Sequence, residues 1–306
     1  MGAVHFAKLR VPCSTSNLGP GYDSIGLALG LWNEFAFERI PSGIEIVLQG
    51  HGADSLERGE NSRAYRAFCA VYERMNEALP GVRIVQRNNV PLARGLGGSA
   101  TAVLAGTTAG LLFSGMEASP LAVLNHSIAI ETHPDNLTPS LVGGLTVSLM
   151  NDGHVAYLKV TPPSELTTVI LIPDRGLVTG AARRVVPETF SRDDVVFNIR
   201  GAAMLMTALA LGDLSSLSLA MRDRLHQPYR LPLLPGMTDI FNAALYAGSP
   251  GVALSGAGSG IFAFAYRENA EKIGAAMQRE AREHGIGACV LHLPIDGRGL
   301  QIVSTG

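Results

Sequence analysis

The stretch PLARGLGGSATA, Pro91 to Ala102, runs from a proline and a glycine cluster into small residues that can begin a helix. The first amide groups of a helix have no intrahelical partner, and the helix dipole adds partial positive charge there. Glycines before that turn let the backbone close around a ligand. The stretch therefore predicts an anion site, most commonly for phosphate, with the Ser99 hydroxyl at the helix start, where it could cap the helix or reach Mg²⁺.

Three interpretations of this stretch compete with one another. A Walker P-loop fails because no lysine follows the glycines. The spacing Gly95-x-Gly97-x-x-Ala100 fits a dinucleotide fingerprint, and Glu117 lies about 20 residues further on. A purely structural turn is the third. The residues alone leave a phosphate site, a nicotinamide-dependent dehydrogenase and a simple turn open.

A second indication comes from an expected helix over residues 119–133. Leu121, Leu124, Ile128 and Glu131 share one face at helical spacing, which puts an acid at the carboxyl end of an apolar stripe. A buried arginine partner or a frayed last turn would explain it. A Mg²⁺ ligand would explain it too, since Mg²⁺ takes one or two carboxylates together with substrate phosphates.

The composition limits the class of protein. The chain has 306 residues, is 47% hydrophobic and 16% charged, and carries a formal net charge of -2. It can bury a large core, and its charge argues against nucleic-acid and anionic-membrane partners. Its three cysteines form no CxxC pair, and no run of about 18 apolar residues occurs. We expect a soluble cytoplasmic protein.

The order of expected elements favours α+β layers, because strands and helices mix without regular βαβ alternation. The proline-rich segment 161–166 is the expected domain joint, and residues 134–136 form a turn. Strands are expected at 4–12, 24–32, 33–40, 82–88, 143–150, 155–160, 167–173, 251–256, 260–266, 288–293 and 300–303, with a loop at 13–23. Helices are expected at 62–79, 99–113, 119–133, 193–212, 213–224, 236–247 and 268–284.

Six segments in the same order resemble the GHMP kinases, from about Val11 to Phe264. PLARGLGGSATA is similar to that family's phosphate loop, and LSGAGSGIFAF to its third, glycine-rich motif. VPCSTSNLGPGYDSIGLAL, ETHPDNLTPSLVGG, LVTGAARRVVP and DRLHQPYR resemble the homoserine kinases among them. The resemblance implies an α+β fold of two domains, an ATP- and Mg²⁺-binding domain over 1–160 and a ferredoxin-like domain with the substrate arginines over 161–306.

The resemblance also implies roles for particular residues. ATP would contact the phosphate loop, Thr179 and, through its adenine, Asn61; the loop residues are Pro91, Leu92, Ala93, Arg94, Gly95, Leu96, Gly97, Gly98, Ser99, Ala100 and Thr101. Ser99 and Glu131 would hold Mg²⁺. The homoserine pocket would contain Asn17, Asp23, His133, Asp135 and Asn136, with Arg183 and Arg230 binding the carboxylate. Asn136, Asn17 and Asp23 are the expected catalytic residues.

The implied reaction moves the γ-phosphoryl group of ATP to the hydroxyl of L-homoserine, a step towards threonine, in an enzyme that could form a homodimer. Phosphoryl transfer depends on positioning and charge neutralisation. The alternatives are a GHMP kinase for another small hydroxylated acid, a dehydrogenase built on residues 95–100, and a non-catalytic ATP sensor. Two departures from the family stand out: Gly98 replaces a serine, and GAGSG replaces GAGPS.

Overall fold

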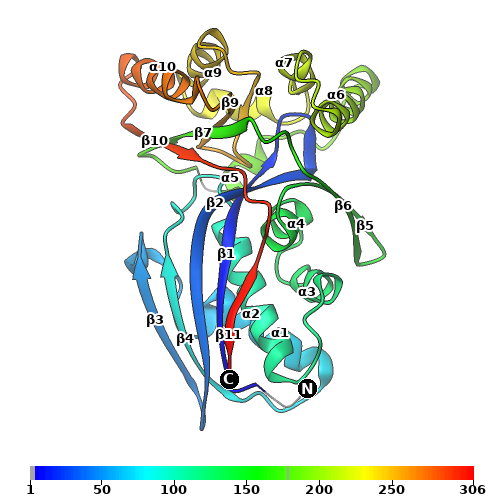
Figure 1. Cartoon of the computed structure of the whole chain (residues 1–306), viewed down its shortest axis with the longest axis vertical. Helices are drawn as coiled ribbons and strands as arrows, with labels where there is room; N and C mark the ends of the chain where they lie inside the picture. The colour runs from blue at the N-terminus through cyan, green and yellow to red at the C-terminus, as the bar shows by residue number, and fades with distance from the viewer. Residues whose placement is uncertain (1–3, 178) are drawn as a thin grey trace.

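A long antiparallel sheet forms the lower half of the molecule in Figure 1. The structure is a computed structural model that describes residues 4–177 and 179–306. The sheet runs in the order β11-β1-β2-β4-β3, with β5 on β2 and β6 on β5, and only β3 and β4 pair in parallel. Its strands are β1 (Phe6–Asn17), β2 (Gly21–Ile40), β3 (Ile44–Gly50), β4 (Gly81–Asn88), β5 (Leu145–Asn151), β6 (His154–Val160) and β11 (Gln301–Thr305).

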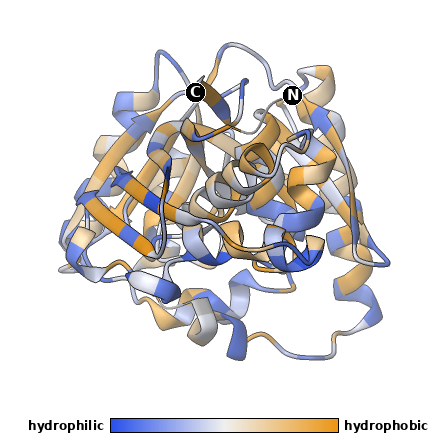
Figure 2. Cartoon of the chain, turned by 90° about the horizontal axis from the view of Figure 1, so that it is seen from below, coloured by the Kyte–Doolittle hydropathy of each residue, from blue (hydrophilic) through white to orange (hydrophobic). Residues whose placement is uncertain are grey.

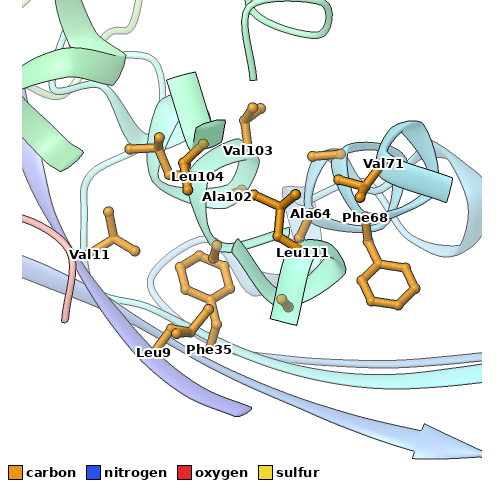
Figure 3. Close-up of a cluster of buried hydrophobic side chains, with 14 of the residues drawn as sticks. Leu9, Val11, Phe35, Ala64, Phe68, Val71, Ala102, Val103, Leu104 and Leu111 are labelled. Carbon is orange, nitrogen blue, oxygen red and sulfur yellow. The ribbon is translucent and has the colours of Figure 1, made fainter. Parts of the chain in front are cut away.

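Helices cover one face of this sheet. They are η1 (Ala53–Ser55), η2 (Gly59–Asn61), α1 (Arg63–Met75), α2 (Gly98–Phe113), α3 (Pro120–Ser127) and α4 (Pro134–Val142). The helix α2 is apolar on all sides and lies between the sheet and α1, as expected for residues 99–113. Figure 3 shows Leu104 and Leu111 of α2 in the cluster that includes Phe35 of β2 and Phe68 of α1. This packing fixes the start of α2, and so the phosphate loop.

A second sheet, antiparallel and in the order β10-β7-β9-β8, lies in the upper half with its own helices (Figure 1). Its strands are β7 (Leu166–Pro173), β8 (Gly251–Leu254), β9 (Ile261–Tyr266) and β10 (Ala288–Leu293). The helices are α5 (Thr179–Arg184), α6 (Arg192–Leu211), α7 (Leu217–Ala220), α8 (Gln227–Arg230), η3 (Leu231–Leu233), α9 (Met237–Tyr246) and α10 (Ala270–Glu283). The predicted α+β class is confirmed.

The chain crosses between the two sheets more than once. The predicted division near residue 160 separates the two sheets for every strand except β11, which returns after β10 to pair with β1. A bridge between Leu29 and Ile295 joins the same two halves. In the hydropathy colouring of Figure 2, hydrophilic segments lie mainly in turns and at helix ends around the periphery.

The first hairpin is more regular than expected. Residues 13–23 were predicted as a loop and 24–40 as two strands, but β1 continues to Asn17 and β2 is a single strand of 20 residues. Register shifts at Pro12/Cys13 and Ser16/Asn17 absorb the irregular residues without ending the pairing. The prediction of a loop was wrong because the polar residues CSTSN belong to a buried strand.

The predicted helix over 119–133 was also wrong. α3 ends at Ser127, and a turn carrying Glu131 follows before α4 begins at Pro134. The helix is shorter than predicted by six residues, and the predicted turn at 134–136 is instead the start of α4, because proline is well suited to the first helical position. Glu131 therefore lies on no helix face, and Leu121, assigned to the apolar face, is 53% exposed. Asp135 and Asn136 lie in the first turn of α4, not in an open turn.

The expected helix over 213–224 is reduced to α7, and β3 and the short helices α5 and α8 were not predicted. α8 is capped by the Asp223 carboxylate, which accepts hydrogen bonds from the amides of His226 (2.9 Å) and Gln227 (2.6 Å).

In the described part of the chain, α6 is the one helix whose length and hydropathy would allow it to span a membrane. It packs against α7 and β2.

Candidate active site

A cavity of about 270 Å³ lies where the ends of β1 and β2, the phosphate loop and the second sheet meet. Its walls come from both halves of the chain. They are Ser16, Asn17, Asp23, Arg63, Pro91, Leu92, Ala93, Arg94, Gly95, Leu96, Gly97, Gly98, Ser99, Ala100, Glu131, His133, Asp135, Asn136, Arg183, Arg230, Gly256 and Ala257. Most of the residues that the sequence assigned to a site thus share one cavity.

The phosphate loop connects β4 to α2 and docks against the second glycine-rich segment. Gly95 has φ +73, and a Cβ there would lie 1.7 Å from the carbonyl oxygen of Ser255, so only glycine fits. The Ser255 hydroxyl donates to the Gly95 carbonyl at 2.9 Å. Arg94 anchors the loop on the other side by donating to the carbonyls of Pro173, at 2.6 Å, and Asp174. These contacts therefore fix the conformation in which the loop lines the cavity at the start of α2.

A hydroxyl and a carboxylate lie close together beside that helix start. The Ser99 hydroxyl donates to Glu131 Oε2 at 2.6 Å, and Arg63 Nη1 lies 3.7 Å from the same carboxylate oxygen. No group of three or more His, Cys, Asp or Glu residues with metal-binding geometry exists among the described residues. One carboxylate and one hydroxyl next to a phosphate loop fit Mg²⁺, which takes few protein ligands and completes its shell with water and phosphate oxygens.

Strained backbone orders the turn between β1 and β2. Asn17 and Asp23 have φ of 71 and 54, values that side chains other than glycine seldom adopt. The Asn17 side chain donates to the Gly256 carbonyl at 2.9 Å and accepts from the Asp23 amide at 3.0 Å. Asn17 thus joins the hairpin to the glycine-rich segment and sets the direction of Asp23.

An ion pair crosses the cavity. Arg183 Nη2 lies 3.0 Å from Asp23 Oδ1, and Nη1 donates to Oδ2 at 3.2 Å. Burial would lower the pKa of Arg183, but the hydrogen bonds and charge of Asp23 raise it above its ordinary value. His133 Nδ1 lies 3.8 Å from Asp23 Oδ2. The pairing is bidentate, and two residues separated by 160 positions form it.

The first turn of α4 supplies the cavity floor. The Asn136 amide accepts from the Ser14 hydroxyl at 3.0 Å and donates to the Ser16 hydroxyl at 3.0 Å, which fixes its orientation.

Burial and the nearby charge of Asp23 raise the pKa of Asp135 to about 7. Arg230, only 1% exposed, lines the same cavity from α8. Near neutral pH the cavity thus holds a carboxyl group that is only partly ionised.

Of the predicted nucleotide-site residues whose side chains the structure describes, Asn61 and Thr101 do not line the cavity. Asn61 is exposed at the end of η2, and the Thr101 hydroxyl is buried against Asn33 Nδ2 at 2.9 Å. Thr179 is the first residue of α5, and its side chain lies outside what the structure describes. Sequence reasoning assigned no role to Ser16, Arg63, Gly256 or Ala257. The last two lie in the third glycine motif and Ser16 lies in the segment VPCSTSNLGPGYDSIGLAL, which were the available signals, whereas Arg63 carries none.

Comparisons with known proteins agree on one family. The family description "GHMP kinases N terminal domain" matches residues 62–144, and "GHMP kinases C terminal" matches residues 205–283. Homoserine kinase of Microchaete diplosiphon is 38% identical over 100% of both chains, and that of Trichormus variabilis is 39% identical over 98% of this chain and 99% of its own. The solved homoserine kinase of Cytophaga hutchinsonii superposes with a TM-score of 0.89 at 26% identity and covers 99% of each chain.

Proposed function

We infer the activity from one premise: the chain belongs to the homoserine kinases of the GHMP kinase family. It is a phosphotransferase with ATP as co-substrate and a small molecule as acceptor. It transfers the γ-phosphoryl group of ATP to the side-chain hydroxyl of L-homoserine and releases ADP and O-phospho-L-homoserine. This product leads towards threonine.

The observation that carries the assignment is the charge arrangement opposite the phosphate loop. Asp23 and Arg183 present opposite charges 3.0 Å apart, and Arg230 adds a second guanidinium in the same cavity. A free amino acid is a zwitterion, so its ammonium group matches Asp23 and its carboxylate matches the two guanidinia. A neutral sugar has no charged group to bind to either the carboxylate or the guanidinia.

The nucleotide belongs at the other end of the cavity. The amides of Gly95 to Ala100 and the start of α2 suit the phosphates. Ser99 and Glu131 would hold Mg²⁺, which would neutralise charge on the phosphates during transfer. Arg63, within 3.7 Å of Glu131, adds positive charge on that side. The orientation of the proposed ligands follows from this separation of charges.

The acceptor hydroxyl would lie beside Asn136, whose amide the serines of β1 hold in place. An amide cannot act as a base near neutral pH. A loose transition state needs little nucleophilic assistance, so the hydroxyl proton leaves late, towards a phosphate oxygen. Asp23 would then serve the ammonium group and Asn17 would position Asp23. His133 and Asp135 complete the substrate pocket.

A coupled ADP-release assay tests this proposal. L-homoserine, mevalonate, galactose and pantoate are offered separately, with and without Mg²⁺. We expect ADP release to require L-homoserine and Mg²⁺ together. Turnover of pantoate or mevalonate without turnover of homoserine would reassign the substrate to another hydroxylated acid. ATP binding without turnover of any acceptor would indicate a sensor, and a thermal shift with NAD alone would favour the dehydrogenase.

Two further expectations belong to the same proposal. A biosynthetic kinase of this class would act in the cytoplasm, which cell fractionation can test. The homodimer suggested by the sequence resemblance would be measured by sedimentation equilibrium. Neither expectation affects the assignment of the cavity.

A further inference from the structure

A cluster of buried polar side chains lies behind the arginine end of the cavity. Asp223 and His226 have side chains that are 0% exposed, and Arg230 is 1% exposed. Only Arg230 belongs to the proposed substrate site. Buried polar groups of this size are costly unless every donor and acceptor is matched. The hydrogen bonds of Asp223, His226 and Arg230 therefore show which group fixes the orientation of which.

The guanidinium of Arg230 is held along one edge. Its Nε donates to the Ala182 carbonyl at 3.1 Å, and its Nη1 lies 3.1 Å from His226 Nδ1 and 3.4 Å from the Gly256 carbonyl. Within the described part of the chain, Nη2 has no protein acceptor. That nitrogen is the one left for a ligand in the cavity that Arg230 lines. The position of Nη2 depends on the bonds made by Nε and Nη1.

The contacts of His226 define its tautomer. Arginine can only donate, so Nδ1 of His226 must accept and carries no proton. The proton of the neutral ring is then on Nε2, which lies 2.8 Å from the Gly19 carbonyl and donates to it. Burial lowers the pKa of His226 and outweighs the opposing charge of Asp223, and the Arg230 guanidinium lowers it as well. The ring is therefore neutral near pH 7.

The same ring contacts residues 19–23, where the turn after β1 leads into β2 and Asp23. Gly19 lies in that turn, and the Tyr22 ring stacks on His226 with centroids 5.1 Å apart. The Arg230 guanidinium lies 5.2 Å from the Tyr22 ring centroid. One imidazole thus touches both the arginine and the segment that presents the opposite charge.

We propose that His226 is a positioning residue for the amino-acid end of the substrate. Its Nδ1 fixes the Arg230 guanidinium, and its Nε2–H fixes Gly19 and with it the start of β2 that presents Asp23. The distance between the carboxylate-binding and ammonium-binding groups is then set by a single rigid ring. The inference rests on the proposed function, because it takes a zwitterionic acceptor as the ligand of these two groups.

Two substitutions remove the hydrogen bonds of His226 to Arg230 and to Gly19 one at a time. In His226→Asn a carbonyl oxygen can take the place of Nδ1, so Arg230 keeps an acceptor. In His226→Gln the longer side chain reaches the place of Nε2, so Gly19 keeps a donor while Arg230 loses its acceptor. Both substitutions remove the stacking on Tyr22, which makes them matched controls for general destabilisation.

The assay measures KM for homoserine, KM for ATP, kcat and Tm for both variants. We expect His226→Gln to raise KM for homoserine roughly tenfold or more, with KM for ATP within about twofold of wild type. His226→Asn keeps the acceptor of Arg230 and loses only the bond to Gly19, so it should raise KM for homoserine less at a similar Tm, because Asn17 still holds Asp23. With 3-aminopropanol, which lacks the carboxylate, the order should reverse: His226→Gln should have a KM near wild type, and His226→Asn a higher one. Equal KM increases for homoserine in both variants, following Tm, would overturn the proposal.

A spectroscopic measurement keeps this inference separate from the assignment of substrate. In ¹⁵N-histidine-labelled protein, His226 should give the neutral Nε2–H tautomer at pH 7 and above, and Arg230→Lys should shift its Nδ1 resonance. A protonated ring at pH 7, or an Nδ1 resonance insensitive to Arg230→Lys, would refute the contact even if homoserine is turned over. Absence of homoserine-dependent ADP release in wild type would refute the proposed function and leave the tautomer result to decide the contact.

Discussion

The two ends of the cavity are built in different ways. The phosphate end uses one continuous stretch, Pro91 to Ala100, and relies on backbone amides and on glycines that bring the chain close to a ligand. The amino-acid end uses long side chains from segments far apart in the sequence. Asp23 and Arg183, for example, are 160 positions apart.

This difference determines what each end tolerates. The phosphate end depends on backbone shape, so it is sensitive to added atoms and less so to the loss of any one side chain. The amino-acid end depends on charge and on buried hydrogen bonds, so removing a side chain leaves a partner unmatched. The predictions below probe this contrast, beginning with the largest expected effect.

Gly95→Ala should be the most damaging change at the phosphate end. The new methyl group would lie 1.7 Å from the Ser255 carbonyl oxygen and the residue would keep φ +73, so the loop must move. We expect kcat/KM for ATP to fall roughly 10²- to 10³-fold, because a shift of about 1 Å at a reacting group costs about 10²-fold. Gly98→Ala is the control, since its Cβ would meet only Val90 Cγ1 at 3.7 Å. Equal losses in both variants would contradict a shape-dependent loop.

Glu131→Gln tests the one place where the phosphate end depends on a carboxylate. The variant keeps the size of the side chain and an acceptor for the Ser99 hydroxyl, but loses the charge. We expect kcat to fall roughly 10²-fold with little change in Tm, since Mg²⁺ supplies several kcal/mol of charge stabilisation. Mn²⁺ binding followed by electron paramagnetic resonance should weaken in parallel. A kcat near that of wild type at saturating Mg²⁺ would rule out a ligand role.

Arg183→Ala and Arg230→Ala probe the amino-acid end. Each should raise KM for homoserine roughly 10- to 100-fold, because a lost charged hydrogen bond costs about 1.5–3 kcal/mol. KM for ATP should change much less. Arg230→Ala should also lower Tm, since Arg230 is buried and its partner His226 would lose a donor, whereas the half-exposed Arg183 should matter less for folding. A collapse of ATP affinity would move both arginines to the nucleotide site.

Asp135 gives the smallest effect, on stability and its pH dependence. Folding raises its pKa from 3.8 to about 7, so between these values the folded state binds a proton that the unfolded chain has released. The free energy of unfolding should therefore fall as pH rises from about 4 to 7. Urea unfolding at pH 5 and pH 8 should show that Asp135→Asn removes roughly 1–3 kcal/mol of this fall. The exposed Asp152→Asn should leave it unchanged, and an equal pH slope in Asp135→Asn and wild type would be inconsistent with the raised pKa.

The sequence predicts the phosphate end well, because its geometry is local. The loop and the start of α2 could be expected from spacing and helix electrostatics, whereas the resemblance implied that Ser99 and Glu131 act together. Glu131 was expected for a partly wrong reason, since the helix assigned to it ends at Ser127. Glu131 nevertheless contacts Ser99, because the turn after α3 brings the Glu131 carboxylate to the start of α2.

The amino-acid end could be approached only through the resemblance to a family. Nothing in the local pattern says that Asp23 meets Arg183, or that Ser14 and Ser16 hold Asn136 across about 120 positions. The first contact joins the two halves of the molecule and the others join β1 to α4, and no periodicity encodes either kind of packing. The same is true of His226, a single buried histidine in a segment where the sequence predicted no element.

A crystal structure with L-homoserine, Mg²⁺ and a non-hydrolysable ATP analogue would test the central claim most directly. We predict that the analogue's phosphates lie on Gly95 to Ala100 with Mg²⁺ between Ser99 and Glu131. The homoserine carboxylate should contact Arg183 and Arg230, its ammonium group Asp23, and its hydroxyl should point at the γ-phosphate beside Asn136. Homoserine bound with its carboxylate away from both arginines, or the nucleotide bound outside the loop, would contradict the division of the cavity into these two ends.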